Sequence, residues 1–103
     1  MTNAQELPVF GVGPESKANG EYLDVRPRQG EEARIETLIY TGAVEVYLTD
    51  GVTTQQLPTD YTSAAVTTGL TFRATYTRYY RIKNVSGGAI TISAEGVFTT
   101  KEA

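Results

Sequence analysis

Hydrophobic and polar residues alternate strictly in the middle of the chain. Over residues 44 to 49 the side chains fall into two sets, one of Val44, Val46 and Leu48 and the other of Glu45, Tyr47 and Thr49. A period of two residues is typical of a β-strand with one buried face. We therefore expect a strand here whose apolar set faces the core.

Turn residues flank this strand on both sides. Thr41-Gly42 precedes it and Asp50-Gly51 follows it. Asp-Gly supplies the positive φ angles that a two-residue hairpin turn requires. Residues 32 to 58 are therefore predicted to form three consecutive strands joined by two tight turns, and the rest of the chain is organised around them.

Two segments before this strand show the same period. Residues 21 to 28 place Leu23 and Val25 on one face and Tyr22, Asp24 and Arg26 on the other, until Pro27 ends the strand or confines it to an edge. In residues 31 to 40 the predicted core residues are Ala33, Ile35, Thr37 and Ile39, while Arg34, Glu36 and Leu38 face outward or towards a second layer.

The segments after the central strand are more varied. Residues 52 to 58 predict a polar edge strand that stops at Pro58. Residues 59 to 69 are irregular and predict a surface loop. A helical turn capped by Asp60 is the less favoured interpretation, because the many threonines disfavour helix.

Alternation returns in the last third of the chain. Leu70, Phe72, Ala74 and Tyr76 share one face, and further on Tyr80 and Ile82 point inward while Arg81 and Lys83 point outward. Ser86-Gly87-Gly88 predicts a hairpin connection into the last strand, residues 89 to 99, where Ile90, Ile92, Ala94 and Phe98 share a face. Gly96 indicates a bulge or a close backbone approach within that strand.

Residues 1 to 20 differ from the rest, with a small apolar island of Leu7, Val9 and Phe10 between polar flanks. One interpretation is a short edge strand or an arm packed on the body. The other is an extended arm that docks on a neighbouring subunit or partner. Pro8 and Pro14 suit both, since proline removes ladder donors and favours extended chain.

Short strands separated by frequent turn signals, without helical periodicity, predict an all-β protein. We expect a single-domain antiparallel β-sandwich or jelly-roll-like fold over residues 21–103, with an extended N-terminal arm over residues 1–20.

Composition removes most catalytic chemistry. The chain has 103 residues, a formal net charge of −3, and neither cysteine nor histidine, so thiol, imidazole and common zinc chemistry are absent. The carboxylates that remain are Glu21, Asp24, Glu45, Asp50, Asp60 and Glu95. Most adjoin turns or wet strand faces, so we expect no enzyme, no cofactor and no metal site.

Charge and hydropathy also limit the partners. An acidic balance argues against nucleic acid, and no apolar run is long enough to span a membrane. The first residues lack the pattern of a signal peptide. We expect a protein that is made in a cytoplasm.

Tyrosine is the most informative residue type. The chain has seven tyrosines and no tryptophan, and Tyr76, Tyr79 and Tyr80 lie close in sequence to Arg73, Arg78 and Arg81. Protein interfaces are enriched in tyrosine and arginine. The alternatives are that half of the tyrosines fill the core, or that they stack on sugars or bases.

Two stretches resemble a known family. IETLIYTGAVEVYLTDG (35–51) and YYRIKNVSGGAITISAEGVFT (79–99) are similar in style to the small β-sandwich decoration, or cement, proteins of tailed-phage capsids. The resemblance implies a non-enzymatic virion protein, often a homotrimer, on the capsid exterior, where it clamps neighbouring subunits of the major capsid protein. Alternatives are a tail or fibre module of a virion and a carbohydrate-binding module.

Two groups of residues are the predicted contacts. Leu7, Val9 and Phe10 are expected to bind a partner through the arm. Tyr76, Arg78, Tyr79 and Arg81 are expected to form a subunit contact.

Overall fold

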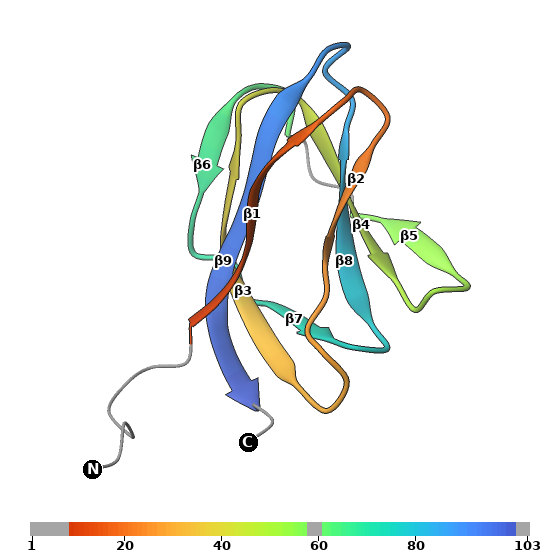
Figure 1. The fold of residues 1–103 in the computed structure, drawn as a ribbon, viewed down its shortest axis with the longest axis vertical. Helices are drawn as coiled ribbons and strands as arrows, with labels where there is room; N and C mark the ends of the chain where they lie inside the picture. Colours follow the sequence, from red (N-terminus) through yellow and green to blue (C-terminus); the bar gives the residue numbers. More distant parts are fainter. Residues whose placement is uncertain (1–8, 58–60, 101–103) are drawn as a thin grey trace.

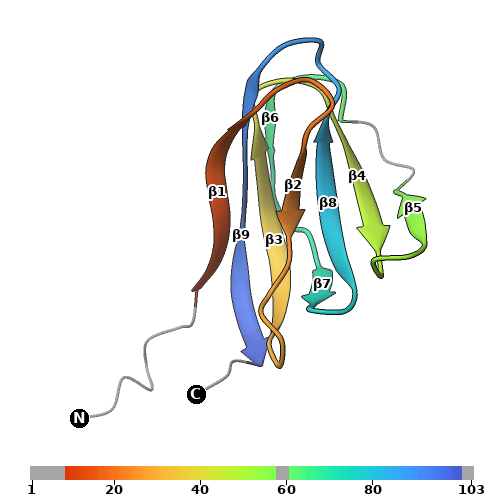
Figure 2. The ribbon, with the colours of Figure 1, turned by 45° about the vertical axis from the view of Figure 1, so that its right-hand side comes forward.

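The computed structural model describes residues 9–57 and 61–100, which form strands and connections without a helix. The strands are β1 (Val9–Lys17), β2 (Tyr22–Val25), β3 (Glu32–Tyr40), β4 (Val44–Thr49), β5 (Thr54–Gln56), β6 (Ala65–Thr67), β7 (Phe72–Thr75), β8 (Tyr79–Asn84) and β9 (Ile90–Thr100). They build two antiparallel sheets packed face to face (Figures 1 and 2). The predicted all-β sandwich is confirmed.

The two sheets have different strand orders. Sheet A has the order β1-β9-β3-β6, and β7 also pairs with β3. Sheet B has the order β2-β8-β4-β5. The polar strand predicted after residue 51 is confirmed as β5, an exposed edge strand.

Most connections cross from one sheet to the other. β3 lies in sheet A and β4 in sheet B, so Thr41-Gly42 carries the chain across the sandwich. β8 and β9 also lie in different sheets, and the hairpin expected at Ser86-Gly87-Gly88 is therefore wrong. Turn residues allow a reversal, but they do not determine which sheet the next strand joins. Of the described strands, only β4–β5 and β6–β7 follow one another within one sheet.

Asn84 holds the crossing between β8 and β9. Its side chain is fully buried, and its Nδ2 donates to the carbonyl oxygens of Lys17 at 2.8 Å and Gly88 at 2.6 Å. Its Oδ1 accepts from the backbone N–H of Ser86 at 2.8 Å and from the Ser86 hydroxyl at 2.7 Å. One buried amide thus ties the end of β1 to the connection between β8 and β9.

Apolar side chains of both sheets meet in one core. The largest fully buried apolar ones are Leu23, Val25, Ile35, Leu38, Val46, Ile82 and Ile92. The rings of Phe72 in sheet A and Tyr80 in sheet B stack with centroids 4.8 Å apart. The inward faces predicted for β2, β4, β8 and β9 are confirmed by this core.

The face predicted for the second half of β3 is wrong. Ala33 and Ile35 point into the core as expected, but Leu38 and Tyr40 follow them inward, while Thr37 and Ile39 are only partly buried. Pairing with β9 steps from Ile35↔Gly96 to Thr37↔Glu95, so one extra residue on β3, Glu36, forms a β-bulge. A bulge shifts the alternation by one residue.

Gly96 lies opposite this bulge, and the close backbone approach predicted for it is confirmed. A β-carbon there would meet the carbonyl group of Arg34 and the Cα of Ile35 at 2.9 Å. Glycine is required because these neighbours are backbone atoms.

The turn after β4 reverses the chain as predicted, but it is longer than two residues. Thr49 pairs with Thr54, which leaves Asp50 to Thr53 as the loop. Only Gly51 has a positive φ, +92°. Asp50 Oδ1 accepts hydrogen bonds from the backbone N–H of Val52 and Thr53. An aspartate-capped turn replaces the expected two-residue turn.

The loop predicted before β7 contains more structure than expected. Tyr61 is buried in the core and bridges to Val44, and β6 pairs with β3. No helical turn is present in residues 61–69. Pro58 and Asp60 lie outside the described residues.

Candidate interaction surface on sheet B

The predicted contact residues lie on β8 and on the connection that leads into it. Tyr79 and Arg81 alternate with the core residues Tyr80 and Ile82, so they project from the outer face of β8. Tyr76 and Arg78 lie on the connection from β7 to β8. Tyr80, which the sequence places near this group, points into the core instead.

Arg26 joins two of these residues, although sequence reasoning did not select it as a contact. Its guanidinium carbon lies 4.0 Å from the ring centroid of Tyr76 and 4.4 Å from that of Tyr79. Its Nε donates to the Tyr76 carbonyl oxygen at 2.7 Å. Tyr79 is only 7% exposed, so the arginine covers a ring that would otherwise face water.

A second aromatic and charged group lies further along the same face. Arg81 lies 4.3 Å from the ring centroid of Tyr22, and its Nε pairs with Asp24 Oδ1 at 2.6 Å. This hydrogen bond raises the pKa of Arg81 above its ordinary value. The Tyr22 ring also meets Tyr47 edge to face at 6.2 Å.

Tyr47 and Glu45 complete the group on β4. The Tyr47 hydroxyl donates to Glu45 Oε1. Because the bond favours the neutral phenol beside a carboxylate, it raises the pKa of Tyr47 to about 12. Lys83 lies opposite Glu45 in the β4–β8 ladder. Its ammonium lies 5.8 Å from the Tyr22 ring centroid and forms no ion pair with a described residue.

We call the following side chains the sheet B outer face, and we include Arg26, Tyr76 and Arg78 from the connections next to its strands: Tyr22, Asp24, Arg26, Glu45, Tyr47, Tyr76, Arg78, Tyr79, Arg81 and Lys83. Four tyrosines lie here, and the other three, Tyr40, Tyr61 and Tyr80, lie in the core. Some tyrosines therefore fill the core, and others lie on a surface where a protein partner could bind.

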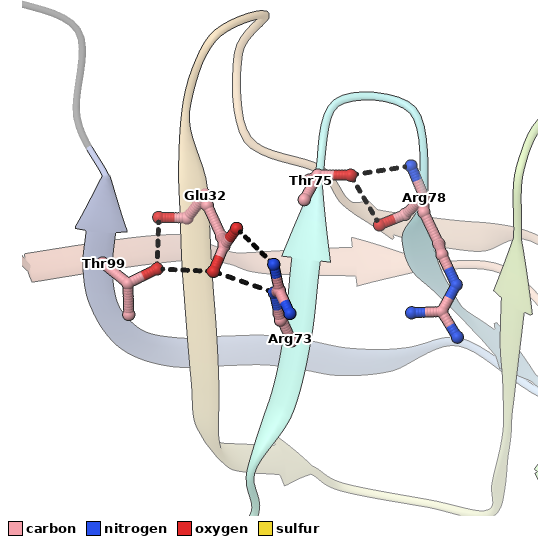
Figure 3. Close-up of polar contacts among 5 residues, drawn as sticks. All are labelled: Glu32, Arg73, Thr75, Arg78 and Thr99. Carbon is pink, nitrogen blue, oxygen red and sulfur yellow. Dashed lines mark hydrogen bonds and ion pairs between the residues drawn. The ribbon is translucent and has the colours of Figure 1, made fainter.

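The outer face of sheet A has a different charge arrangement. Arg34 pairs with Glu36 at 2.7 Å, Arg73 with Glu32 at 2.9 Å and Lys17 with Glu15 at 3.0 Å. Arg73 and the Thr99 hydroxyl both donate to Glu32 (Figure 3), which lowers the pKa of that carboxyl. The cations of the sheet A strands are thus neutralised locally.

The predicted arm residues separate in the structure. Phe10 is buried in the core, edge to face with Phe98 at 5.3 Å. Val9 is 71% exposed at the start of β1 and lines a shallow cavity of ≈ 320 Å³ beside Pro27 and Arg28. Leu7 lies outside the described residues. Of the three, Val9 is the side chain that the described structure leaves open to a partner.

Most of the carboxylates considered for catalysis form hydrogen bonds or ion pairs that stabilise the fold. Asp24 pairs with Arg81, Asp50 caps its turn, and Glu45 accepts from Tyr47. Glu21 Oε1 accepts from the backbone N–H of Ala18 at 2.7 Å, and Glu95 is exposed on β9. Within residues 9–57 and 61–100, no acidic group is arranged to hold a metal ion, and no helix could cross a membrane.

Comparisons with known proteins give no family assignment. No protein-family model matches the chain, and no curated protein is significantly similar to it.

Proposed function

We propose that the chain is a non-enzymatic structural protein of a phage virion, which decorates and stabilises the capsid by bridging neighbouring capsid subunits. The observation that carries this proposal is the sheet B outer face, where tyrosines and arginines gather in contact with one another. Such side chains provide large contact area with polar tips. The resemblance of residues 35–51 and 79–99 to capsid decoration proteins supports the same role.

The proposed mechanism is mass action on assembly. A molecule that binds only the assembled shell stabilises it, because opening the shell would release the bound copies. The partner is the major capsid protein, and the site of action is the capsid exterior. A homotrimer suits positions where three capsid subunits meet.

The test uses purified shells of the encoding phage that lack this chain. We expect the chain to sediment with the shells, to saturate, and to raise their melting temperature. Binding to purified tails and not to heads would move the role to a tail or fibre module. Binding to neither would overturn the proposal.

Oligomeric state is tested by light scattering coupled to size exclusion. A mass three times that of one chain would support a trimer. A monomer in solution that binds in groups of three on shells would assign trimer formation to the capsid surface.

Val9 provides a test of the N-terminal contact. Val9→Ser should reduce shell occupancy without changing the fold, since this side chain is exposed. Val66→Ser is the matched control, because Val66 is 61% exposed on β6. Equal occupancy of the two variants would remove Val9 from the contact.

Stacking on sugars is not favoured at Tyr22, the exposed tyrosine of β2. Arg81 already lies over its ring at 4.3 Å, and Tyr47 meets it edge to face. A sugar would have to displace the arginine from this face and from its pair with Asp24.

A further inference from the structure

The cations of the described residues fall into two classes. Lys17, Arg28, Arg34, Arg73 and Arg81 each form an ion pair. In residues 9–57 and 61–100, the cations without a carboxylate partner are Arg26, Arg78 and Lys83. All three belong to the sheet B outer face, although the whole chain carries a net charge of −3.

Arg26 is fixed in position for binding. Two tyrosine rings and one hydrogen bond from its Nε hold the guanidinium, while its two terminal nitrogens donate to no other described residue. A cation held in this way loses little conformational entropy when an acceptor arrives.

Lys83 and Arg78 are available for a different reason. Glu45, the carboxylate opposite Lys83 in the ladder, accepts the Tyr47 hydroxyl. Arg78 closes its turn through backbone bonds with Thr75, and its guanidinium extends away from Thr75 (Figure 3). Neither cation forms an ion pair with a described residue.

We infer that the sheet B outer face docks a protein surface that presents carboxylates, with Arg26, Arg78 and Lys83 pairing with those carboxylates and Tyr22, Tyr47 and Tyr76 supplying the contact area. Charge complementarity identifies the occupant, because the face carries unpaired cations amid exposed rings. The inference rests on the proposed function only in taking that partner to be a capsid subunit.

The first experiment needs no capsid. Poly-L-glutamate is titrated into the ¹⁵N-labelled chain at low ionic strength, where exposed charges are least screened. We expect shifts in the side-chain Nε–H signal of Arg26 and in the amides of Tyr22, Tyr47 and Lys83, with Arg34 and Arg73 unmoved. Shifts confined to sheet A, or none, would overturn the inference. A stronger response to a single-stranded oligonucleotide would also overturn it, in favour of nucleic acid.

The second experiment uses shells and two charge-matched variants. Arg78→Gln with Lys83→Gln removes two unpaired cations, and Arg34→Gln with Arg73→Gln removes two paired ones. We expect about tenfold weaker shell binding for the first variant and an unchanged affinity for the second, with circular dichroism confirming both folds. Equal affinities would overturn the inference and leave the proposed function standing. If the unmodified chain binds no shells, the proposed function fails, and the poly-L-glutamate result alone decides the inference.

Discussion

Gly96 lies against the backbone of Arg34, where a β-carbon would come within 2.8 Å of the Arg34 carbonyl carbon. Backbone atoms cannot rotate away as a side chain would. We therefore expect Gly96→Ala to lower the free energy of unfolding by about 3 kcal/mol, measured in urea. Gly88→Ala is the matched control, because open space surrounds Gly88. Equal losses for the two variants would show that the β3 bulge adapts freely.

Asn84 is expected to be the most sensitive polar residue of the core. Asn84→Ala removes the side-chain partner of the Lys17 carbonyl and of the Ser86 N–H, and leaves the Gly88 carbonyl with only the Ser86 hydroxyl. We expect a loss of about 3 kcal/mol in urea-induced unfolding. Asn19→Ala, which removes one exposed bond to the Gly87 N–H, should cost far less.

Asn84→Asp adds a dependence on pH to that loss. A carboxylate would face two carbonyl oxygens in a buried site, so its pKa would rise in the folded state. Stability is then best below the ordinary aspartate pKa of about 3.9 and falls as pH rises through the folded value. Unfolding midpoints that do not depend on pH more than those of Asn84→Ala would contradict this.

Arg26 is expected to contribute to stability through packing on Tyr76 and Tyr79. Arg26→Ala would expose the Tyr79 ring and should cost about 1–2 kcal/mol of unfolding free energy. Arg78→Ala removes the same charge from a side chain without a ring contact, and should cost less than about 0.5 kcal/mol. A larger effect at Arg78 would mean that charge, and not packing, dominates.

Acid should weaken the fold partly through Asp50. The backbone N–H groups of Thr53 and Val52 hold the pKa of its carboxyl below the ordinary value. A lowered folded pKa gives stability that is present above the unfolded pKa and is lost as pH falls through the folded value. We expect Asp50→Asn to be less stable than the parent at neutral pH and to lose less on acidification. Identical acid profiles would exclude Asp50 as a contributor.

Alkali should act on the half-buried Tyr47 only at high pH. Its pKa of about 12 exceeds the unfolded value near 10, so the stability that it gives is full below pH 10 and is lost as pH rises through about 12. We expect Tyr47→Phe to remove a step near pH 12 from the tyrosinate absorbance titration. A step of unchanged height and midpoint would assign it to another tyrosine.

The alternation of residues was sufficient to predict strands but not their partners. Val44 and Val46, or Tyr80 and Ile82, point inward because the local period alone determines it. The Glu36 bulge has no local mark on β3, and its only signal lies at Gly96, some sixty residues away. A hairpin within one sheet and a connection between two sheets use the same small residues. The sequence Ser86-Gly87-Gly88 therefore predicted a reversal but not which of these two connections it forms.

The candidate surface was predictable only in part for the same reason. Arg81 and Lys83 were placed correctly on the outward face of β8. Arg26 was not predicted as a contact residue because the rings that it covers, Tyr76 and Tyr79, lie about fifty residues later in the chain. The pairing of β2 with β8 brings the arginine and these rings together. The signal within reach was that Arg26 shares a predicted face with Tyr22 and Asp24.

The crossing connections have a consequence for how the chain folds. Since successive strands mostly belong to opposite sheets, neither sheet can be completed from one continuous part of the sequence. Most strand pairs must close a long loop, at a cost in chain entropy, before their hydrogen bonds and packing stabilise them. This gives a high contact order and folding on the scale of about milliseconds to seconds. We expect unfolding to be a single cooperative transition. When the chain is cut at any connection, neither fragment should fold on its own. The β4–β5 hairpin lies within one sheet, and Val52 at its tip is 92% exposed. An inserted peptide should therefore slow folding least at this tip.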